Sequence, residues 1–307
     1  MSELFVSYAI ISSFFWAVFT FLSKYILARK MRNSVSFTYL QGILIMVLFP
    51  ALSYLIVPDQ IYIPPIAIVP YAIVSGGTSI LAYLLMYYGL MRYDASSAAP
   101  IVCTQSIFVI PLTYVFLGEY YGLTAILWIM IAVVGAIMTS WDEKIKARQL
   151  FSFKNKALWI FLMVALLYAL GNVAVKPALK FVSNFNFLIW REVAWFGSLI
   201  LLMPLIFRKN ERGVFRANWK EILIPLALGV SMLYFMYVMM FYALGVSVQI
   251  TMGLAASNGL FAVIIGFLVS RTSLGAILEK HETRIYILRM IGALMILVAI
   301  FELSMAI

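Results

Sequence analysis

Long apolar stretches separated by short polar loops run through this chain of 307 residues. Each stretch has about 20 residues, the length that a helix needs to cross the hydrocarbon core of a membrane. We place the stretches near residues 4–28, 34–57, 66–91, 95–117 and 122–140, and near 157–178, 186–207, 219–244, 247–270 and 283–304. The pattern predicts an all-α polytopic membrane protein with ten transmembrane helices.

The same pattern of five stretches occurs twice. A shift of 154 positions brings Tyr88 onto Tyr242 and Leu90 onto Leu244, and a shift of 152 brings Trp16 onto Tyr168 and Lys24 onto Lys176. Such an internal repeat is typical of transporters that bind their substrate between two halves. We therefore expect one unit in two halves, residues 1–145 and residues 146–307.

The odd number of stretches in each half decides how the halves are related. After five crossings the second half enters the membrane from the opposite side, so the repeat is predicted to be inverted. Proline and glycine interrupt the fourth stretch and its counterpart, for example at Pro111 and Gly253. Such breaks are tolerated where neighbouring helices or a cavity satisfy the freed backbone groups.

The basic residues are unevenly divided between the loops. The loops after stretches 1, 3, 5, 7 and 9 hold 17 of the 22 lysines and arginines. Because cytoplasmic loops are enriched in these residues, both termini are predicted to lie outside the cytoplasm. The same distribution explains the net charge of +10 by membrane orientation, so we expect no nucleic-acid partner. We expect a multi-pass protein of the plasma or inner membrane, as a monomer or homodimer.

The composition excludes several kinds of function. The chain is 65% hydrophobic and 11% charged, so the lipid bilayer must cover much of its surface. It has one cysteine and one histidine, Cys103 and His281, which leaves no disulfide framework and no spaced metal-ligand set. No nucleotide-binding motif and no nucleophile with a base is found. We expect no enzyme activity, no cofactor and no metal.

Several weak motifs in a fixed order resemble one known family. They are the Trp-Ala and Tyr-Ala pairs that precede Lys24 and Lys176, and the run YDASSAAPIVCTQSIFVIPLTYVFLGE, which includes Ala95, Ser96, Ser97, Ala98, Pro111, Gly118 and Glu119. In this order the chain resembles the EamA-like branch of the drug/metabolite transporter superfamily. The first half resembles it better, because Arg271, Thr272 and Ser273 replace the Gly-Glu pair in the second half.

The resemblance implies a protein whose helices surround a central cavity and that exports or exchanges small polar metabolites by alternating access. Well-studied members usually have cytoplasmic termini, whereas the loop charges here favour the reverse. We expect a secondary transporter, an exporter of amino acids or related zwitterions. The alternatives are an exchanger of anionic or phosphorylated metabolites and, in another class, a channel or membrane scaffold.

Ionisable residues within the apolar stretches are candidates for substrate binding, because burying them in lipid is costly. Lys24 and Lys176 are repeat equivalents, and each could present a cation to a substrate or extend to the headgroups. Arg191 could bind the carboxylate of a substrate, or a carboxylate within the bundle could neutralise it. Adjacent positions on a helix point in different directions, so Glu192 is expected to be a poor partner for it. Glu119 is expected to be solvated or to line a gate.

Uncharged side chains form a second set of candidates. The amides of Gln105, Asn172 and Asn258 lie at the depth of the membrane centre, where they could bind a substrate or bond to other helices. Trp16 and Tyr168 are too deep for an interfacial role and could stack on a substrate. The run from Gly76 to Ser79 predicts either a close approach between helices or a hinge for rocking.

Overall fold

The computed structural model describes residues 2–29, 33–92, 101–102, 104–120, 122–139, 156–206, 209–261, 264–265 and 283–305. Within these ranges the chain is helical and has no strand. The main helices are α1 (Ser2–Arg29), α2 (Ser34–Ile56), α3 (Val69–Leu90), α5 (Gln105–Leu117), α6 (Leu123–Thr139), α8 (Lys156–Val173), α9 (Val175–Ala178), α10 (Asn184–Ile206), α11 (Lys209–Val246), α12 (Val248–Leu254) and α14 (Thr283–Met305).

Five segments of the described chain are long and apolar enough to cross a membrane. They are Leu4–Leu27, Ser34–Ile56, Ile66–Leu90, Leu158–Ala178 and Trp219–Val246, and Gln105–Leu117 and Leu123–Met138 are shorter apolar helices. Helices α10 and α14 coincide with two further predicted stretches. Parts of the predicted stretches 95–117 and 247–270 lie outside the described residues.

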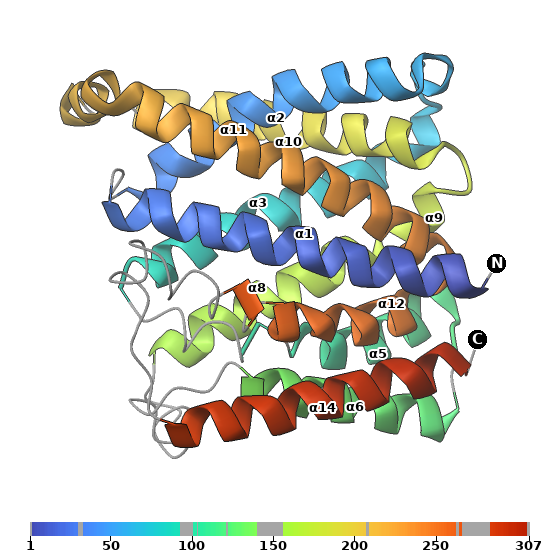
Figure 1. Cartoon of the computed structure of the whole chain (residues 1–307). Coiled ribbons are helices and arrows are strands. Elements are labelled where there is room, and N and C mark those ends of the chain that lie inside the picture. Colours follow the sequence, from blue (N-terminus) through green and yellow to red (C-terminus); the bar gives the residue numbers. More distant parts are fainter. Residues whose placement is uncertain are drawn as a thin grey trace.

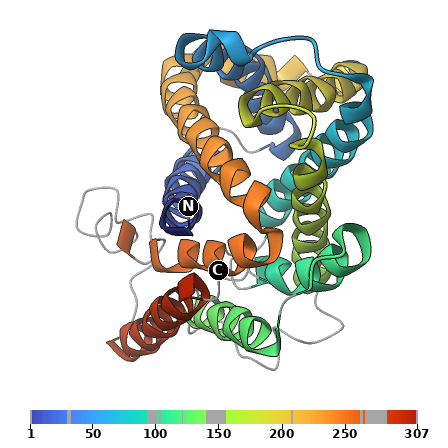
Figure 2. The same ribbon diagram turned by 90° about the vertical axis from the view of Figure 1, so that its right-hand side faces the viewer.

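The helices form a bundle in which distant parts of the sequence pack together (Figures 1 and 2). Helix α1 packs against α11, and α3 packs against α8. The pair α2 and α10 lies at one edge of the bundle, and the pair α6 and α14 at the opposite edge. Figure 2 looks onto the end of the bundle where both chain ends lie.

Small residues allow the closest of these contacts. A Cβ atom on Gly76 would lie 2.6 Å from the backbone oxygen of Arg191, and one on Gly171 would lie 2.7 Å from Oγ1 of Thr78. The predicted close approach at the Gly76–Ser79 run is therefore confirmed, with α10 and α8 as the two helices that approach it. This approach places α10 against the serines of α3.

Two of the predicted stretches contain breaks in their helices. Helix α12 ends at Leu254 and is followed by a 3-10 turn, η3 (Ala255–Ser257), and helix α8 ends one residue before α9. Neighbouring serines bond to the carbonyl oxygens at the first break. Ser106 donates to the oxygen of Met252 at 2.7 Å, and Ser13 donates to that of Ala255 at 3.5 Å. Polar backbone groups are thus tolerated beside a cavity.

Candidate functional site

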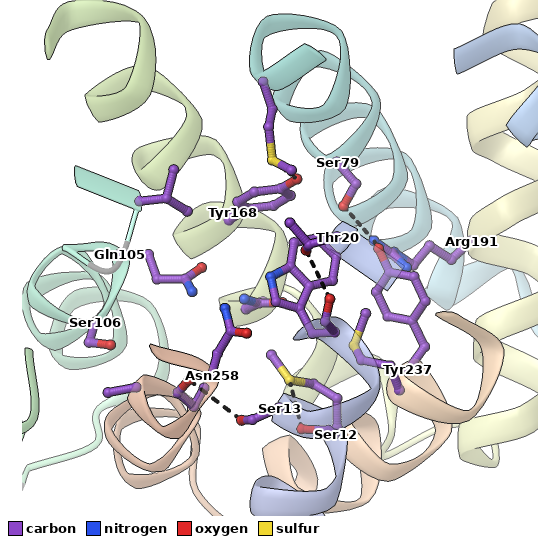
Figure 3. Close-up of a pocket in the computed structure, with 18 of the residues that line it drawn as sticks. Ser12, Ser13, Thr20, Ser79, Gln105, Ser106, Tyr168, Arg191, Tyr237 and Asn258 are labelled. Carbon is purple, nitrogen blue, oxygen red and sulfur yellow. Dashed lines mark hydrogen bonds between the residues drawn. The ribbon is translucent and has the colours of Figure 1, made fainter. Parts of the chain in front are cut away.

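A cavity of about 140 Å³ lies near the centre of the bundle (Figure 3). It extends along α3 to Leu90, toward the bundle end opposite the chain termini. Its lining consists of Ser12, Ser13, Trp16, Thr20, Ser79, Met86, Leu90, Val102, Gln105, Ser106, Tyr168, Asn172, Arg191, Met236, Tyr237, Met240, Ala255, Ala256 and Asn258. Apolar and aromatic side chains line the cavity together with hydroxyl, amide and guanidinium groups, a combination that suits a small-molecule site.

Most of the candidates from the sequence line this cavity. Trp16, Gln105, Tyr168, Asn172, Arg191 and Asn258 do so, although they come from five separate segments of the chain. Lys24 and Lys176 are not in the lining. Substrate contact by any of the eight residues stays a prediction.

Trp16 and Tyr168, which the repeat makes equivalent, contact each other. Their ring centroids are 5.9 Å apart with an edge-to-face angle of 89°. Each ring also lies near Tyr83, at 6.1 Å and 5.8 Å between centroids. Aromatic pairs in this geometry are stable without a ligand. They form a rigid wall of the cavity.

Arg191 lies at one end of the cavity with its side chain 3% exposed. Its Nε donates to Oγ of Ser75 at 3.0 Å, and its Nη2 donates to Oγ of Ser79 and to the hydroxyl of Tyr237. Its Nη1 is 2.7 Å from Oε1 of Glu192. The expectation that Glu192 would be a poor partner is wrong, because the long side chains of adjacent residues can bend toward each other.

The amides of Gln105, Asn172 and Asn258 lie away from Arg191 in the cavity, and they have hydrogen-bonding groups with weak protein partners or none in the described part of the chain. Nδ2 of Asn172 donates only to the sulfur of Met252, at 3.2 Å, and a thioether is a weak acceptor. Oδ1 of Asn258 is shielded from solvent and has no partner within the described part of the chain. In the same part, the side chain of Gln105 makes no hydrogen bond. Unpaired buried polar atoms are costly, so this end favours a polar ligand.

Lys176 bonds to two other segments at the bundle end near the termini. Its Nζ is 2.6 Å from Oε1 of Glu119, which follows α5, and 2.6 Å from the backbone oxygen of Val246 at the end of α11. The side chains of Lys176 and Glu119 are 23% and 11% exposed. The expectation of a solvated Glu119 is therefore wrong, because the ion pair holds this carboxylate against the protein.

Comparison with known proteins gives a match to a family model and matches to solved structures. Residues 4–141 match the EamA-like transporter family. The predicted resemblance is confirmed. This family belongs to the drug/metabolite transporter superfamily. The match over the first half of the chain and the apolar helices support a multi-pass membrane protein.

One of the matching solved structures is similar over nearly the whole chain. This crystal structure shares 12% sequence identity with the present chain at a TM-score of 0.66, and the match covers 98% of this chain and 95% of that chain. At this identity the match establishes the fold alone. No curated protein sequence matches the chain.

The cavity also contains residues that the sequence did not indicate. Ser12 and Ser13 are short polar residues within an apolar stretch, which gives them no distinctive pattern, and the run that contains Ser79 indicated helix packing instead of a cavity. Tyr237 had a usable signal, because a shift of 154 places it on Tyr83. The two hydroxyl oxygens are 3.1 Å apart, so this equivalent pair meets directly. Among the described residues, no group of His, Cys, Asp and Glu could hold a metal ion.

Proposed function

We propose that this protein is a secondary transporter that exports amino acids or related zwitterionic metabolites by alternating access. The observation that carries the proposal is the polarity of the central cavity. One end holds the guanidinium of Arg191 with serine and tyrosine hydroxyls, and the other end holds amides with unused acceptors. A carboxylate suits the first end and an ammonium group suits the second.

The balance of charge favours a zwitterion over a dianion such as a phosphorylated sugar. Arg191 is the charged residue of the lining as far as the structure describes it, and Glu192 neutralises it at 2.7 Å. A dianion would enter this cavity without matching positive charge, and burying unpaired charge is costly. Lys24 and Lys176, which could have supplied that charge, are outside the lining.

Ten spans arranged as two inverted five-helix repeats are part of the proposal. The helix contacts support it, because exchanging the halves turns the α1–α11 contact into the α8–α3 contact. Repeat equivalents also meet at Trp16 with Tyr168 and at Tyr83 with Tyr237. Direct contact between equivalents is expected along the axis that relates two inverted repeats.

Alternating access requires one end of the cavity to close while the other opens. The bond of Lys176 to Glu119 and to Val246 supports closure at the terminus end, because it joins α9, the segment after α5, and α11. The extension of the cavity to Leu90 supports access from the opposite end. A cavity that the Lys176 bonds close at one end, and that extends toward the other end, favours a carrier over a channel.

The orientation in the membrane is proposed from the loop charges. Arg29, Arg92 and Lys156 lie at helix ends on the side opposite both termini (Figure 1). This arrangement supports a cytoplasmic location for that side and a location outside the cytoplasm for the termini.

The proposal is tested by transport in proteoliposomes that contain the purified protein. We expect uptake or counterflow of at least one labelled L-amino acid, and no exchange of glucose 6-phosphate. Exchange of the phosphate ester without movement of any amino acid would contradict the proposal. Empty liposomes provide the control for passive leakage.

A further inference from the structure

We infer that the hydroxyls of Tyr237 and Ser79 form the subsite for the substrate's carboxylate, with Arg191 as a positioning residue behind them. This inference rests on the proposed function and assigns the contacts of one end of the cavity. It differs from the simpler hypothesis that Arg191 binds the carboxylate directly. The difference follows from the hydrogen bonds that the guanidinium already makes.

Few of Arg191's donors are free to bind a ligand. A guanidinium has five N–H donors in a fixed planar arrangement. Nε bonds to Ser75, Nη1 bonds to Glu192, and Nη2 bonds to both Ser79 and Tyr237, which leaves one N–H on Nη1. A bidentate contact with a carboxylate would require breaking bonds within the protein. The guanidinium therefore orients its neighbours.

The direction of the bonds around Tyr237 can be worked out from burial. Its hydroxyl accepts from Arg191 at 3.3 Å and is 3.1 Å from the hydroxyl of Tyr83. Tyr83 is 1% exposed, and within the described residues Tyr237 is its hydroxyl's only hydrogen-bonding partner. A buried donor without an acceptor is costly, so Tyr83 donates to Tyr237. The proton of Tyr237 is then free, and this residue lines the cavity.

Ser79 is in the same situation. Its hydroxyl oxygen accepts from Nη2 of Arg191, and its own proton has no acceptor in the part of the chain that the structure describes. Ser79 also lines the cavity, and Figure 3 places it with Arg191 and Tyr237 on one side. The hydroxyls of Ser79 and Tyr237 therefore lie close together as donors, because both of their oxygens accept from Nη2 of Arg191.

This arrangement selects for a carboxylate. A hydroxyl that accepts a bond from a guanidinium becomes a better donor, because hydrogen bonds in a chain polarise one another. The two donors are therefore polarised by Arg191, which keeps its pairing with Glu192. A carboxylate oxygen gains two bonds to these donors, whereas a primary amide in its place gains weaker, uncharged ones.

The test measures which ligand groups depend on Tyr237. Purified wild-type protein is compared with Tyr237→Phe, which removes the free hydroxyl and keeps the ring. The matched control is Tyr234→Phe on the same helix, because the Tyr234 hydroxyl bonds to Ser53 at 2.9 Å and lies outside the lining. Thermal stabilisation gives the affinity for each of the twenty L-amino acids, for the amide of the best binder, and for its carboxylate analogue without the amino group.

We expect the wild-type protein to prefer the amino acid over its amide. Tyr237→Phe should weaken the amino acid by about tenfold or more, the value of a hydrogen bond to a charged group, and should leave the amide nearly unchanged. Tyr234→Phe should preserve the preference. Equal losses for acid and amide, or no loss in Tyr237→Phe, would overturn the subsite while leaving the proposed function intact.

The other outcomes separate the two proposals. Binding of the carboxylate analogues without any amino acid, lost in Tyr237→Phe, would refute zwitterion transport and support the subsite. Binding by glucose 6-phosphate with no carboxylate compound would overturn both. The role of Arg191 is measured with the charge-neutral pair Arg191→Met and Glu192→Gln. This pair should lose the acid preference, with little further loss when Tyr237→Phe and Ser79→Ala are added.

Discussion

The contact between α3 and α10 at Gly76 determines where Arg191 lies, and replacing this glycine tests the packing directly. In Gly76→Ala the new Cβ atom would lie 2.6 Å from the backbone oxygen of Arg191, although real contacts of this kind stay above 3.0 Å. The two helices must therefore separate by about 0.4 Å, the difference between these distances. Strain of this kind in a packed core costs about 1–3 kcal/mol.

The neighbouring glycine provides a matched control. A Cβ atom on Gly77 would meet no atom within 4 Å. Both substitutions gain the higher helix propensity of alanine, about 1 kcal/mol at most. Gly77→Ala should therefore be neutral or stabilising, and Gly76→Ala should be about 1–3 kcal/mol less stable than Gly77→Ala.

The assay is the unfolding of purified protein in mixed detergent micelles during titration with sodium dodecyl sulfate, followed by tryptophan fluorescence. Equal unfolding free energies for the two variants would refute the packing argument, because the helix-propensity gain is the same in both. A second readout is affinity for the substrate, which should fall in Gly76→Ala because Arg191 moves away from Ser75 and Ser79.

Three further predictions concern the ends of the cavity and the orientation. Glu119→Gln removes the ion pair with Lys176 and should open the cavity at the terminus end. An impermeant thiol reagent added on that side should then react faster with a cysteine introduced at Ser13, which lines the cavity. Lys24→Ala should leave substrate affinity unchanged in a binding assay, because Lys24 is outside the cavity lining. In a chain without its native cysteine, Lys146→Cys should be labelled only after cells are permeabilised, because loops rich in basic residues face the cytoplasm.

Each of these predictions can fail in a defined way. Unchanged labelling in Glu119→Gln would mean that the ion pair does not hold that end closed. Lost binding in Lys24→Ala, at normal protein levels, would support direct substrate contact by this lysine. Labelling of Lys146→Cys in intact cells would reverse the orientation, and Tyr62→Cys, in the exposed segment between α2 and α3, is the matched site on the other side.

The helices could largely be located from the sequence. The stretch expected at 34–57 is α2, Ser34–Ile56, and the stretch expected at 283–304 is α14, Thr283–Met305. Apolar length is a reliable guide because a chain in lipid must satisfy its backbone hydrogen bonds within each helix. Apolar length is a weaker guide to where a helix begins or ends when its terminal turns are polar. Helix α11 begins at Lys209 instead of near residue 219, because a helix can continue in water where hydropathy gives no signal.

The sequence indicated which residues lie at the candidate site better than it indicated which residues they contact. Trp16 and Tyr168 were paired from the repeat, and their rings do meet. The repeat also pairs Lys24 with Lys176, but it could not predict the bond between Lys176 and Glu119, because the equivalent position of Glu119 is Ser273. Where the two halves differ, symmetry no longer predicts the partner.

The sequence by itself determined that this chain forms apolar helices in a membrane and that it contains an EamA-like transporter segment, because both follow from local composition and order. The tertiary structure alone decided which donors remain free for a ligand. Arg191 has the same five donors in any sequence context, and only its contacts with Ser75, Ser79, Glu192 and Tyr237 show that four of them are used. Those contacts join α3, α10 and α11, whose side chains meet only once the helices are packed.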